Sequence, residues 1–214
     1  MKKIIIVGVG GFGREVAWLI ERINQIKPTW ELLGFVDDNI ELIGSVVGGY
    51  PVLGDCNWLN RQQGELYAVC AIGASKVRKQ VIKKLKGVKF ATLIDPKVEM
   101  SKRVNLGEGC IICAGTILTV DITIGSHVII NLDCTIGHDA VMNDFVTLYP
   151  SVNISGNTVL GECVEMGTGC QIIQGITIGD ETIVGAGAVV VRELPRACTA
   201  VGSPAKPIKF SANQ

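Results

Sequence analysis

Two histidines, His127 and His138, are the first candidates for acid–base chemistry in this 214-residue chain. Asp139 follows His138 directly, so its carboxylate could hold one ring nitrogen while the other nitrogen takes a proton. We interpret His127 as structural. Cys110 and Cys113 have the spacing of a metal-binding pair, but neither a second pair nor a histidine lies nearby in the sequence. The sequence therefore predicts general-base chemistry at His138 and Asp139 and predicts no metal site.

A glycine-rich segment near the amino terminus is the second candidate. It follows the apolar run Ile4–Val7, matches the pattern G-x-G-x-x-G, and precedes an apolar stripe of helical spacing. Backbone N–H groups at the start of a helix favour a phosphate. A second apolar run ends in Asp37 and Asp38, where acidic side chains could meet a ribose or a base. The predicted binding residues are Gly8, Gly10, Gly11, Phe12, Gly13, Asp37 and Asp38.

The first 95 residues have enough predicted elements for half of a doubly wound dinucleotide fold. Further strands are expected at 66–72 and 88–94, with a helix between them that ends before Gly87. Half of that fold suits a mononucleotide or a nucleotide sugar better than NAD. The alternative is a βαβ unit whose glycines serve only tight packing. We expect the basic residues of the helix to form a solvated face: Lys76, Arg78, Lys79, Lys83, Lys84 and Lys86.

A six-residue period fills the remainder of the chain. Sixteen large aliphatic residues recur at every sixth position from Met100 to Val190, small or β-branched residues lie two positions earlier, and glycine is frequent one position later. Three such units close a triangular coil of eighteen residues, which predicts a parallel β-helix of hexapeptide repeats. In known hexapeptide proteins of this kind the coil is left-handed, and we expect the same here.

The fold class expected is thus an α/β Rossmann-like half-domain over residues 1–95, followed by a left-handed parallel β-helix with a carboxy-terminal tail over 96–214. Net charge changes from +4 to −4 between these segments, and the whole chain is neutral. Neutrality argues against a nucleic-acid partner. No apolar run reaches about 18 residues, so membrane insertion is not expected and the predicted location is cytoplasmic.

The eighteen-residue coil supports the interpretation of His138 as a general base. Gly156 lies eighteen residues after His138, so it should stack on the imidazole, leave space there and offer a backbone N–H. The alternative is that His138 is an ordinary solvated turn residue. Two histidines cannot supply the three-histidine zinc site of β-helical carbonic anhydrases.

Cys134 falls in the small inward class of the repeat and is interpreted as a core residue that fills space, together with Cys110 and Cys170.

The whole chain resembles the bacterial sugar acetyltransferases that modify sialic acid or nucleotide-linked amino sugars, such as the bacillosamine precursor and perosamine. These enzymes belong to the hexapeptide-repeat acyltransferase superfamily. The glycine segment, Asp37-Asp38, the hexads, Gly137-His138-Asp139 and the tail Val201–Lys206 carry the resemblance. It implies a homotrimer of β-helices with acetyl-CoA between neighbouring prisms, a nucleotide sugar on the amino-terminal domain, and a role in surface glycan biosynthesis.

Site residues follow from the resemblance position by position. His138 matches the general base, Asp139 its acidic partner, and Gly156 the glycine whose amide faces the thioester carbonyl. Asn131 matches an asparagine near the site. Thr147 stands where many relatives have a second histidine on the acetyl-CoA side, and Phe12 where some have a histidine in the glycine loop.

Coenzyme A phosphates need cations, and the repeat contains no Lys or Arg between residues 104 and 191. Of the basic residues that follow it, Lys206 is the predicted contact.

We expect direct acetyl transfer from acetyl-CoA to a sugar amine or hydroxyl. Two alternatives remain: an acetyltransferase for a free sugar or another small molecule, of the sialic acid or serine type, and a non-catalytic trimeric scaffold that binds nucleotide sugars. The glycine segment argues against the first, and His138 with Asp139 against the second.

Overall fold

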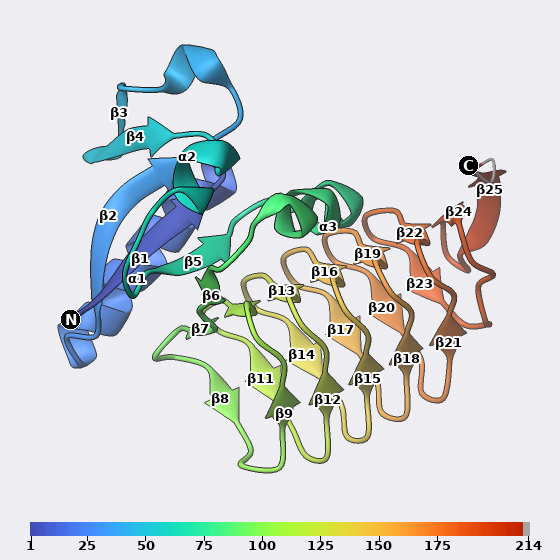
Figure 1. Ribbon diagram of the computed structural model, residues 1–214. Helices are drawn as coiled ribbons and strands as arrows, with labels where there is room; N and C mark the ends of the chain where they lie inside the picture. Colours follow the sequence, from blue (N-terminus) through green and yellow to red (C-terminus); the bar gives the residue numbers. More distant parts are fainter. Residues whose placement is uncertain (212–214) are drawn as a thin grey trace. The chain divides into compact units, whose positions relative to one another are not determined.

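The computed structural model describes residues 1–211 and divides the chain into two compact units, Met1–Pro96 and Lys97–Gln214 (Figure 1). Each unit has its own architecture. The elements of the first are β1 (Lys2–Val7), α1 (Gly11–Ile26), β2 (Trp30–Val36), η1 (Ile40–Leu42), β3 (Val46–Val47), β4 (Tyr50–Gly54), α2 (Cys56–Asn60), β5 (Tyr67–Cys70), α3 (Ser75–Lys84), β6 (Lys89–Phe90) and β7 (Leu93–Ile94).

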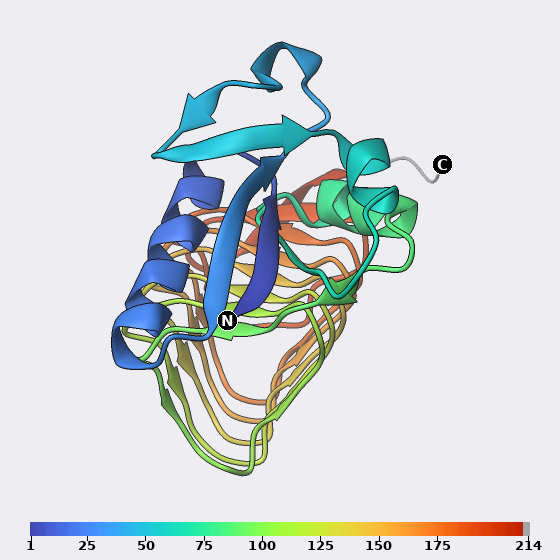
Figure 2. The ribbon, with the colours of Figure 1, turned by 60° about the vertical axis from the view of Figure 1, so that its left-hand side comes forward.

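The sheet of the first unit has the strand order β3-β4-β2-β1-β5-β6 and is parallel except for the pair β3 and β4. Strands β2 and β5 pair with opposite sides of β1, so the strand order reverses at β1. Alternate residues of β1 point to opposite faces of the sheet. In Figure 2, α1 covers one face of the sheet, and α2 and α3 lie on the other. This is the predicted Rossmann-like arrangement.

Two expectations for this unit were wrong in part. The strand expected at 88–94 is broken into β6 and β7. Arg78 does not belong to a solvated face: it is 1% exposed, and its Nη1 donates to the carbonyls of Ile72 at 2.6 Å and Gly73 at 2.9 Å. A guanidinium carries several donors in a fixed fork, so Arg78 can satisfy adjacent carbonyls beyond the end of β5. Arg78 therefore fixes the loop that follows this strand.

The end of the first unit is attached to α1 by an ion pair. Arg22 Nε lies 2.5 Å from Asp95 Oδ2, and Arg22 Nη2 lies 2.8 Å from Asp95 Oδ1. Asp95 is buried, and a buried carboxylate needs such a partner. The bidentate pair fixes the chain immediately before Pro96.

The second unit is a solenoid of sixteen two-residue strands followed by two longer ones within the described chain. Each short strand ends at one of the sixteen predicted aliphatic positions, which confirms the hexapeptide β-helix. The strands are β8 (Glu99–Met100), β9 (Asn105–Leu106), β10 (Ile111–Ile112), β11 (Ile117–Leu118), β12 (Thr123–Ile124), β13 (Ile129–Ile130), β14 (Thr135–Ile136), β15 (Val141–Met142), β16 (Thr147–Leu148), β17 (Asn153–Ile154), β18 (Val159–Leu160), β19 (Glu165–Met166), β20 (Gln171–Ile172), β21 (Thr177–Ile178), β22 (Ile183–Val184), β23 (Val189–Val190), β24 (Cys198–Val201) and β25 (Lys206–Phe210).

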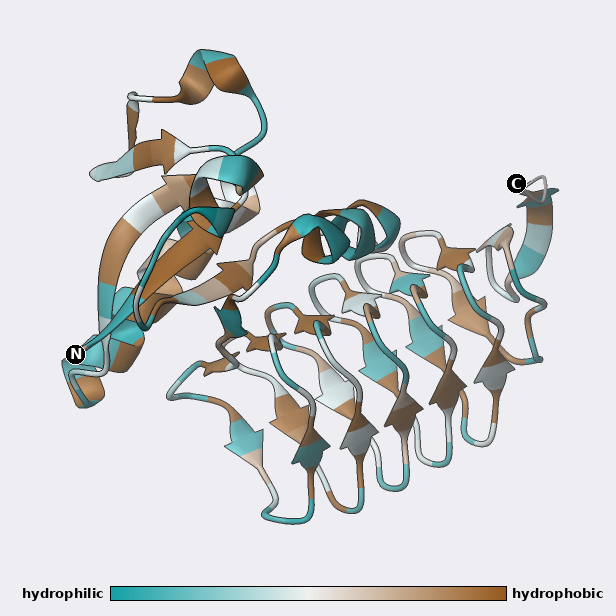
Figure 3. Cartoon of the chain, in the orientation of Figure 1, coloured by the Kyte–Doolittle hydropathy of each residue, from teal (hydrophilic) through white to brown (hydrophobic). Residues whose placement is uncertain are grey.

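Every third short strand joins the same face of the prism, so residues eighteen apart pair in parallel register. The first face contains β10, β13, β16, β19 and β22, the second β8, β11, β14, β17, β20 and β23, and the third β9, β12, β15, β18 and β21. In Figure 3 some solenoid strands, such as β15 and β18, are hydrophobic, whereas others, such as β17 and β20, also carry a hydrophilic residue, and most corner loops are hydrophilic or neutral. Cys110, Cys134 and Cys170 are 0% exposed, which confirms them as core residues.

The corners have a backbone requirement that the glycine pattern did not reveal. Every sixth residue from Gly109 to Gly187 has φ between +55° and +78°, and nine of these fourteen residues are not glycine. The frequent glycines after the aliphatic positions have another cause. A Cβ on Gly167 would lie 2.6 Å from the backbone nitrogen of Ala186 in the next coil. Glycine is needed there because adjacent coils stack closely.

None of the helices within residues 1–211 is long and apolar enough to cross a membrane.

The stacking requirement gives a first prediction. Gly167→Ala should lower the free energy of unfolding by roughly 1–3 kcal/mol, because the new methyl group meets a rigid backbone. Gly175→Asn is the control: Gly175 has φ +78°, a Cβ there has open space, and Asn157 already occupies the matching position one coil earlier. Chemical denaturation of both variants measures the difference. Equal destabilisation by the two substitutions would contradict the stacking explanation.

Candidate active site

His138 lies at a corner of the solenoid between β14 and β15. The backbone fixes this corner from both sides: Asp139 N donates to the Val120 carbonyl at 3.1 Å, and Asn157 N donates to the His138 carbonyl at 2.8 Å. Asp139 has φ +59°, the left-handed conformation of the repeat. The imidazole is thus carried on a rigid turn that is bonded to the coils before and after it.

The imidazole and the neighbouring carboxylate form a dyad. His138 Nδ1 lies 2.7 Å from Asp139 Oδ2, and the two side chains are 49% and 53% exposed. When Nδ1 carries the proton of this hydrogen bond, Nε2 carries the lone pair. The arrangement can therefore accept a proton at Nε2 from a group in solvent or in a ligand.

Gly156 lies against the ring, as the eighteen-residue spacing predicts. A Cβ at this position would lie 2.6 Å from both Cε1 and Nε2 of His138, so a side chain does not fit beside the imidazole in its present position. Among the described residues, no backbone acceptor is bonded to the Gly156 N–H. The corner thus brings together a base, its carboxylate partner and a backbone amide.

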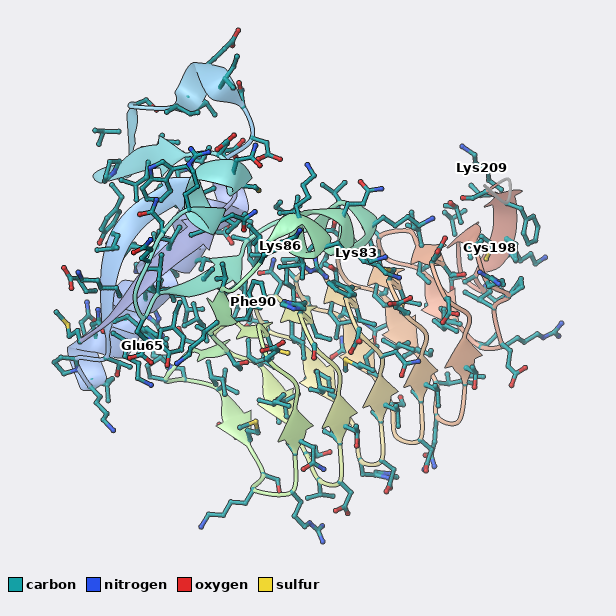
Figure 4. The ribbon with its side chains drawn as sticks, viewed as in Figure 1. Glu65, Lys83, Lys86, Phe90, Cys198 and Lys209 are labelled. Atoms are coloured by element: carbon teal, nitrogen blue, oxygen red, sulfur yellow. The ribbon has the colours of Figure 1, made fainter. Side chains whose placement is uncertain are left out.

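The other site residues expected in the repeat lie elsewhere on this chain. Asn131 follows β13 and is 9% exposed, and its Oδ1 accepts from the N–H of Leu132 at 2.8 Å. Thr147 lies on β16, on the face opposite the His138 corner, and is 1% exposed. Lys206 begins the exposed strand β25, which pairs antiparallel with β24 near the carboxyl end. Figure 4 shows Lys209 projecting from the same strand.

The glycine segment of the first unit forms the predicted turn from strand to helix. Gly8 has φ +102°, Gly10 precedes the first residue of α1, and Gly13 is buried against the Gly8 carbonyl. Asp37 supports this turn, because its carboxylate accepts from the N–H of Val9 at 3.0 Å and from that of Asn39 at 2.9 Å.

A pocket of about 270 Å³ lies at the carboxyl ends of β1, β2 and β5 in the first unit. In open parallel sheets, ligands bind where the strand order reverses, and this pocket lies at that point. Gly8, Asp37 and Asp38 are among the lining residues, whereas Gly10, Gly11, Phe12 and Gly13 are not. The lining residues are Val7, Gly8, Val36, Asp37, Asp38, Cys56, Ile72, Val77, Gln80, Val81 and Lys84.

Lys84 is a pocket residue that sequence reasoning missed, because it was assigned to the solvated face of its helix. Its Nζ lies 3.0 Å from Asp38 Oδ2, and the backbone N–H of Cys56 donates to Asp38 Oδ1 at 3.1 Å. The hydrogen bonds from Cys56, followed by that from Lys84, hold the pKa of Asp38 below its ordinary value. Asp38 is therefore an ionised carboxylate beside an ammonium group.

The cysteines have the properties of structural residues. All eight are free and buried, and burial raises the pKa of the Cys134 thiol to about 11. A protonated buried thiol is a poor nucleophile. Among residues 1–211, no group of three or more His, Cys, Asp or Glu side chains is placed to hold a metal ion.

The hexapeptide β-helix and its corner histidine place the protein in the class of hexapeptide acyltransferases, and comparisons with known proteins support this. The PglD N-terminal domain family matches residues 3–85. GDP-perosamine N-acetyltransferase from Escherichia coli is 31% identical over 215 residues, which cover 96% of each chain. The chain belongs to the family of that enzyme, and the recognised resemblance and the assignment to acetyl-CoA-dependent acyltransferases are confirmed.

Solved structures give the same result. PerB from Caulobacter crescentus, in complex with CoA and GDP-perosamine, is 33% identical with a TM-score of 0.85, and the match covers 98% of each chain. The acetyltransferase domain of PglB from Neisseria gonorrhoeae, in complex with acetyl coenzyme A, is 33% identical with a TM-score of 0.88 and covers 97% of this chain and 99% of that one. A serine acetyltransferase from Helicobacter pylori is 38% identical but covers only 34% of this chain.

The close stacking at the corner gives a second prediction. In Gly156→Ala the new methyl group must displace the imidazole, so acetyl transfer should fall by at least about tenfold while the fold is retained, since small misplacements of a reacting group are costly. Steady-state kinetics and thermal melting of the variant measure both effects. Unchanged turnover would show that the present position of the ring is not required.

Proposed function

We propose that this protein transfers the acetyl group of acetyl-CoA to the amino group, or a hydroxyl group, of a nucleotide-linked sugar in surface glycan biosynthesis. The observation that carries the proposal is the dyad of His138 and Asp139 held against Gly156 on a family-typical β-helix. The pocket of the first unit and the relatives that bind GDP-perosamine support a nucleotide sugar as acceptor.

The proposed reaction is a direct transfer in a ternary complex. The sugar nitrogen attacks the thioester carbonyl, and His138 Nε2 takes the proton that the nitrogen loses. Asp139 holds the imidazole through Nδ1, and the Gly156 N–H faces the oxygen that becomes negative. The new C–N bond forms, the C–S bond breaks, and the proton passes to the leaving thiolate of coenzyme A.

The two units would hold different substrates. We assign residues 1–95 to the nucleotide sugar, whose diphosphate would lie over the glycine segment at the start of α1, and residues 96–214 to acyl transfer. Lys206 is the proposed contact for a coenzyme A phosphate. No observation specifically favours the free-sugar, serine-type or non-catalytic alternatives: the serine acetyltransferase covers a third of the chain, and a scaffold does not need the dyad.

We further propose a homotrimer with acetyl-CoA in the grooves between neighbouring prisms. Asn131 and Thr147 lie away from the His138 corner of their own chain. A groove between subunits would allow these residues of one chain to complete the site of its neighbour.

The central test removes the base. His138→Ala should lower turnover at least about a hundredfold, because proton removal by a positioned base contributes about 10²–10⁴-fold, while acetyl-CoA binding is retained. Asp139→Asn should cost less, since the imidazole remains. Near-normal turnover of His138→Ala, measured with the variant shown to be folded by circular dichroism, would be incompatible with the assigned role.

The cysteines give a separate prediction on mechanism. Incubation with acetyl-CoA alone should release no burst of free coenzyme A and should add no acetyl mass to the protein, because Cys134 and the other thiols are buried. Intact-protein mass spectrometry measures this directly. A stoichiometric acetyl adduct on a cysteine that passes to the sugar would overturn direct transfer.

A further inference from the structure

The corner that carries His138 belongs to a stack of equivalent corners along one edge of the solenoid (Figure 1). The loops that join β8 to β9, β11 to β12 and β14 to β15 follow strands that pair in register, so residues eighteen apart occupy equivalent places. Arg103, Asp121, Asp139 and Asn157 form one such series, which we call the Asp139 column. One basic and two acidic residues thus lie on successive coils at the edge that carries the dyad.

Contacts within the Asp139 column pass from one coil to the next. Arg103 Nη2 lies 3.3 Å from Asp121 Oδ2, which is an ion pair between residues eighteen apart. Asp121 and Asp139 share the left-handed backbone conformation, with φ of +58° and +59°, and Asp139 N donates to the Val120 carbonyl of the coil before. Their Cβ atoms therefore point in the same direction, separated by about 4.8 Å, the spacing of paired strands.

The other two corners show where a side chain at this position lies. A Cβ added to Gly109 would meet the ring of His127, and one added to Gly115 would meet the carboxylate of Asp133. In both cases the contacting side chain comes from the residue eighteen positions later and lies over the coil before it. By the same geometry the Asp139 carboxylate lies next to that of Asp121.

The charged groups that face the imidazole come from its own coil and the coils before it. Residues 155–157, in the coil after it, carry no charge. A protonated imidazole is stabilised by a nearby carboxylate and destabilised by a nearby cation. The charged side chains at this edge, from the dyad to two coils before it, are those of Asp139, Asp121, Lys102 and Arg103.

We propose that Asp121 is a positioning residue for the general base and that Arg103 limits its effect. Asp121 places a second negative charge behind Asp139, which stabilises the imidazolium that forms when His138 takes the proton. Repulsion between the two carboxylates also favours the orientation in which Asp139 meets the ring. Arg103 neutralises part of the Asp121 charge. The catalytic meaning of the column rests on the proposed function and adds to it the residues that adjust the strength of the base.

The test is an NMR titration of the full-length protein with histidine labelled at Cε1. The chain has two histidines, so His138→Ala assigns both signals. Asp121→Asn removes a negative charge and should lower the pH midpoint of the His138 signal by about half a pH unit, whereas Arg103→Met removes a positive charge and should raise it. The acid limb of the pH profile of kcat/KM should move in the same direction in each variant.

Asp133→Asn is the matched control, because Asp133 is exposed, has a φ of +56° and lies at a different corner. It makes the same change in charge as Asp121→Asn and should leave the His138 midpoint in place. Both expected shifts should shrink in 1 M salt, where the Debye length is about 3 Å.

Three results would overturn the proposal: an unchanged midpoint in Asp121→Asn, a shift of the same sign in Asp121→Asn and Arg103→Met, or an equal shift in Asp133→Asn. A loss of local structure would not produce opposite shifts from two adjacent members of the column. Midpoints that shift as expected, without any matching movement of the acid limb of kcat/KM, would instead contradict His138 as the base and with it the proposed function.

Discussion

The parallel pairing of coils in register is the constraint on which the second unit depends. Thr135 pairs with Asn153 and Ile136 with Ile154, so the corner loops that follow these two adjacent strands begin at equivalent positions. Two residues later, His138 necessarily lies over Gly156. The same register makes the Gly156 position intolerant of a side chain and fixes the ring against an amide. The candidate active site is therefore a product of the repeat as much as of the histidine itself.

Much of this unit could be predicted from the sequence because one packing rule is repeated sixteen times. Each coil must fill the same narrow interior, so the aliphatic and small positions are visible without any alignment. The left-handed corner was not visible, since residues as different as Phe145 and Glu181 occupy it. Hydrogen bonds between coils impose that conformation: Phe145 N donates to Ser126 O, and Glu181 N to Glu162 O. Composition at a position does not reveal a backbone constraint of this kind.

In the first unit, less of the candidate site could be predicted from the sequence. The glycine turn and its acidic partners are local signals, and they were identified. The basic residues of α3 carry the same charge but have different surroundings. Arg78 is buried against the loop after β5, Lys84 lies beside Asp38, and Lys83 is exposed. Their roles depend on which strand and loop ends lie beside the helix, and spacing along the helix does not supply that information. The surroundings of Asn131 and Thr147 could not be predicted from their spacing either, since a single chain does not bring these residues to His138.

Initial-rate kinetics with acetyl-CoA and GDP-perosamine as varied substrates, compared with free perosamine, test the central claim most directly. The account predicts intersecting double-reciprocal lines, as expected for a ternary complex, an N-acetylated nucleotide sugar as product, and a much lower kcat/KM for the free sugar. Parallel lines would indicate a covalent acyl-enzyme instead. Equal kcat/KM for the free sugar and the nucleotide sugar would contradict a role for the first unit in substrate binding.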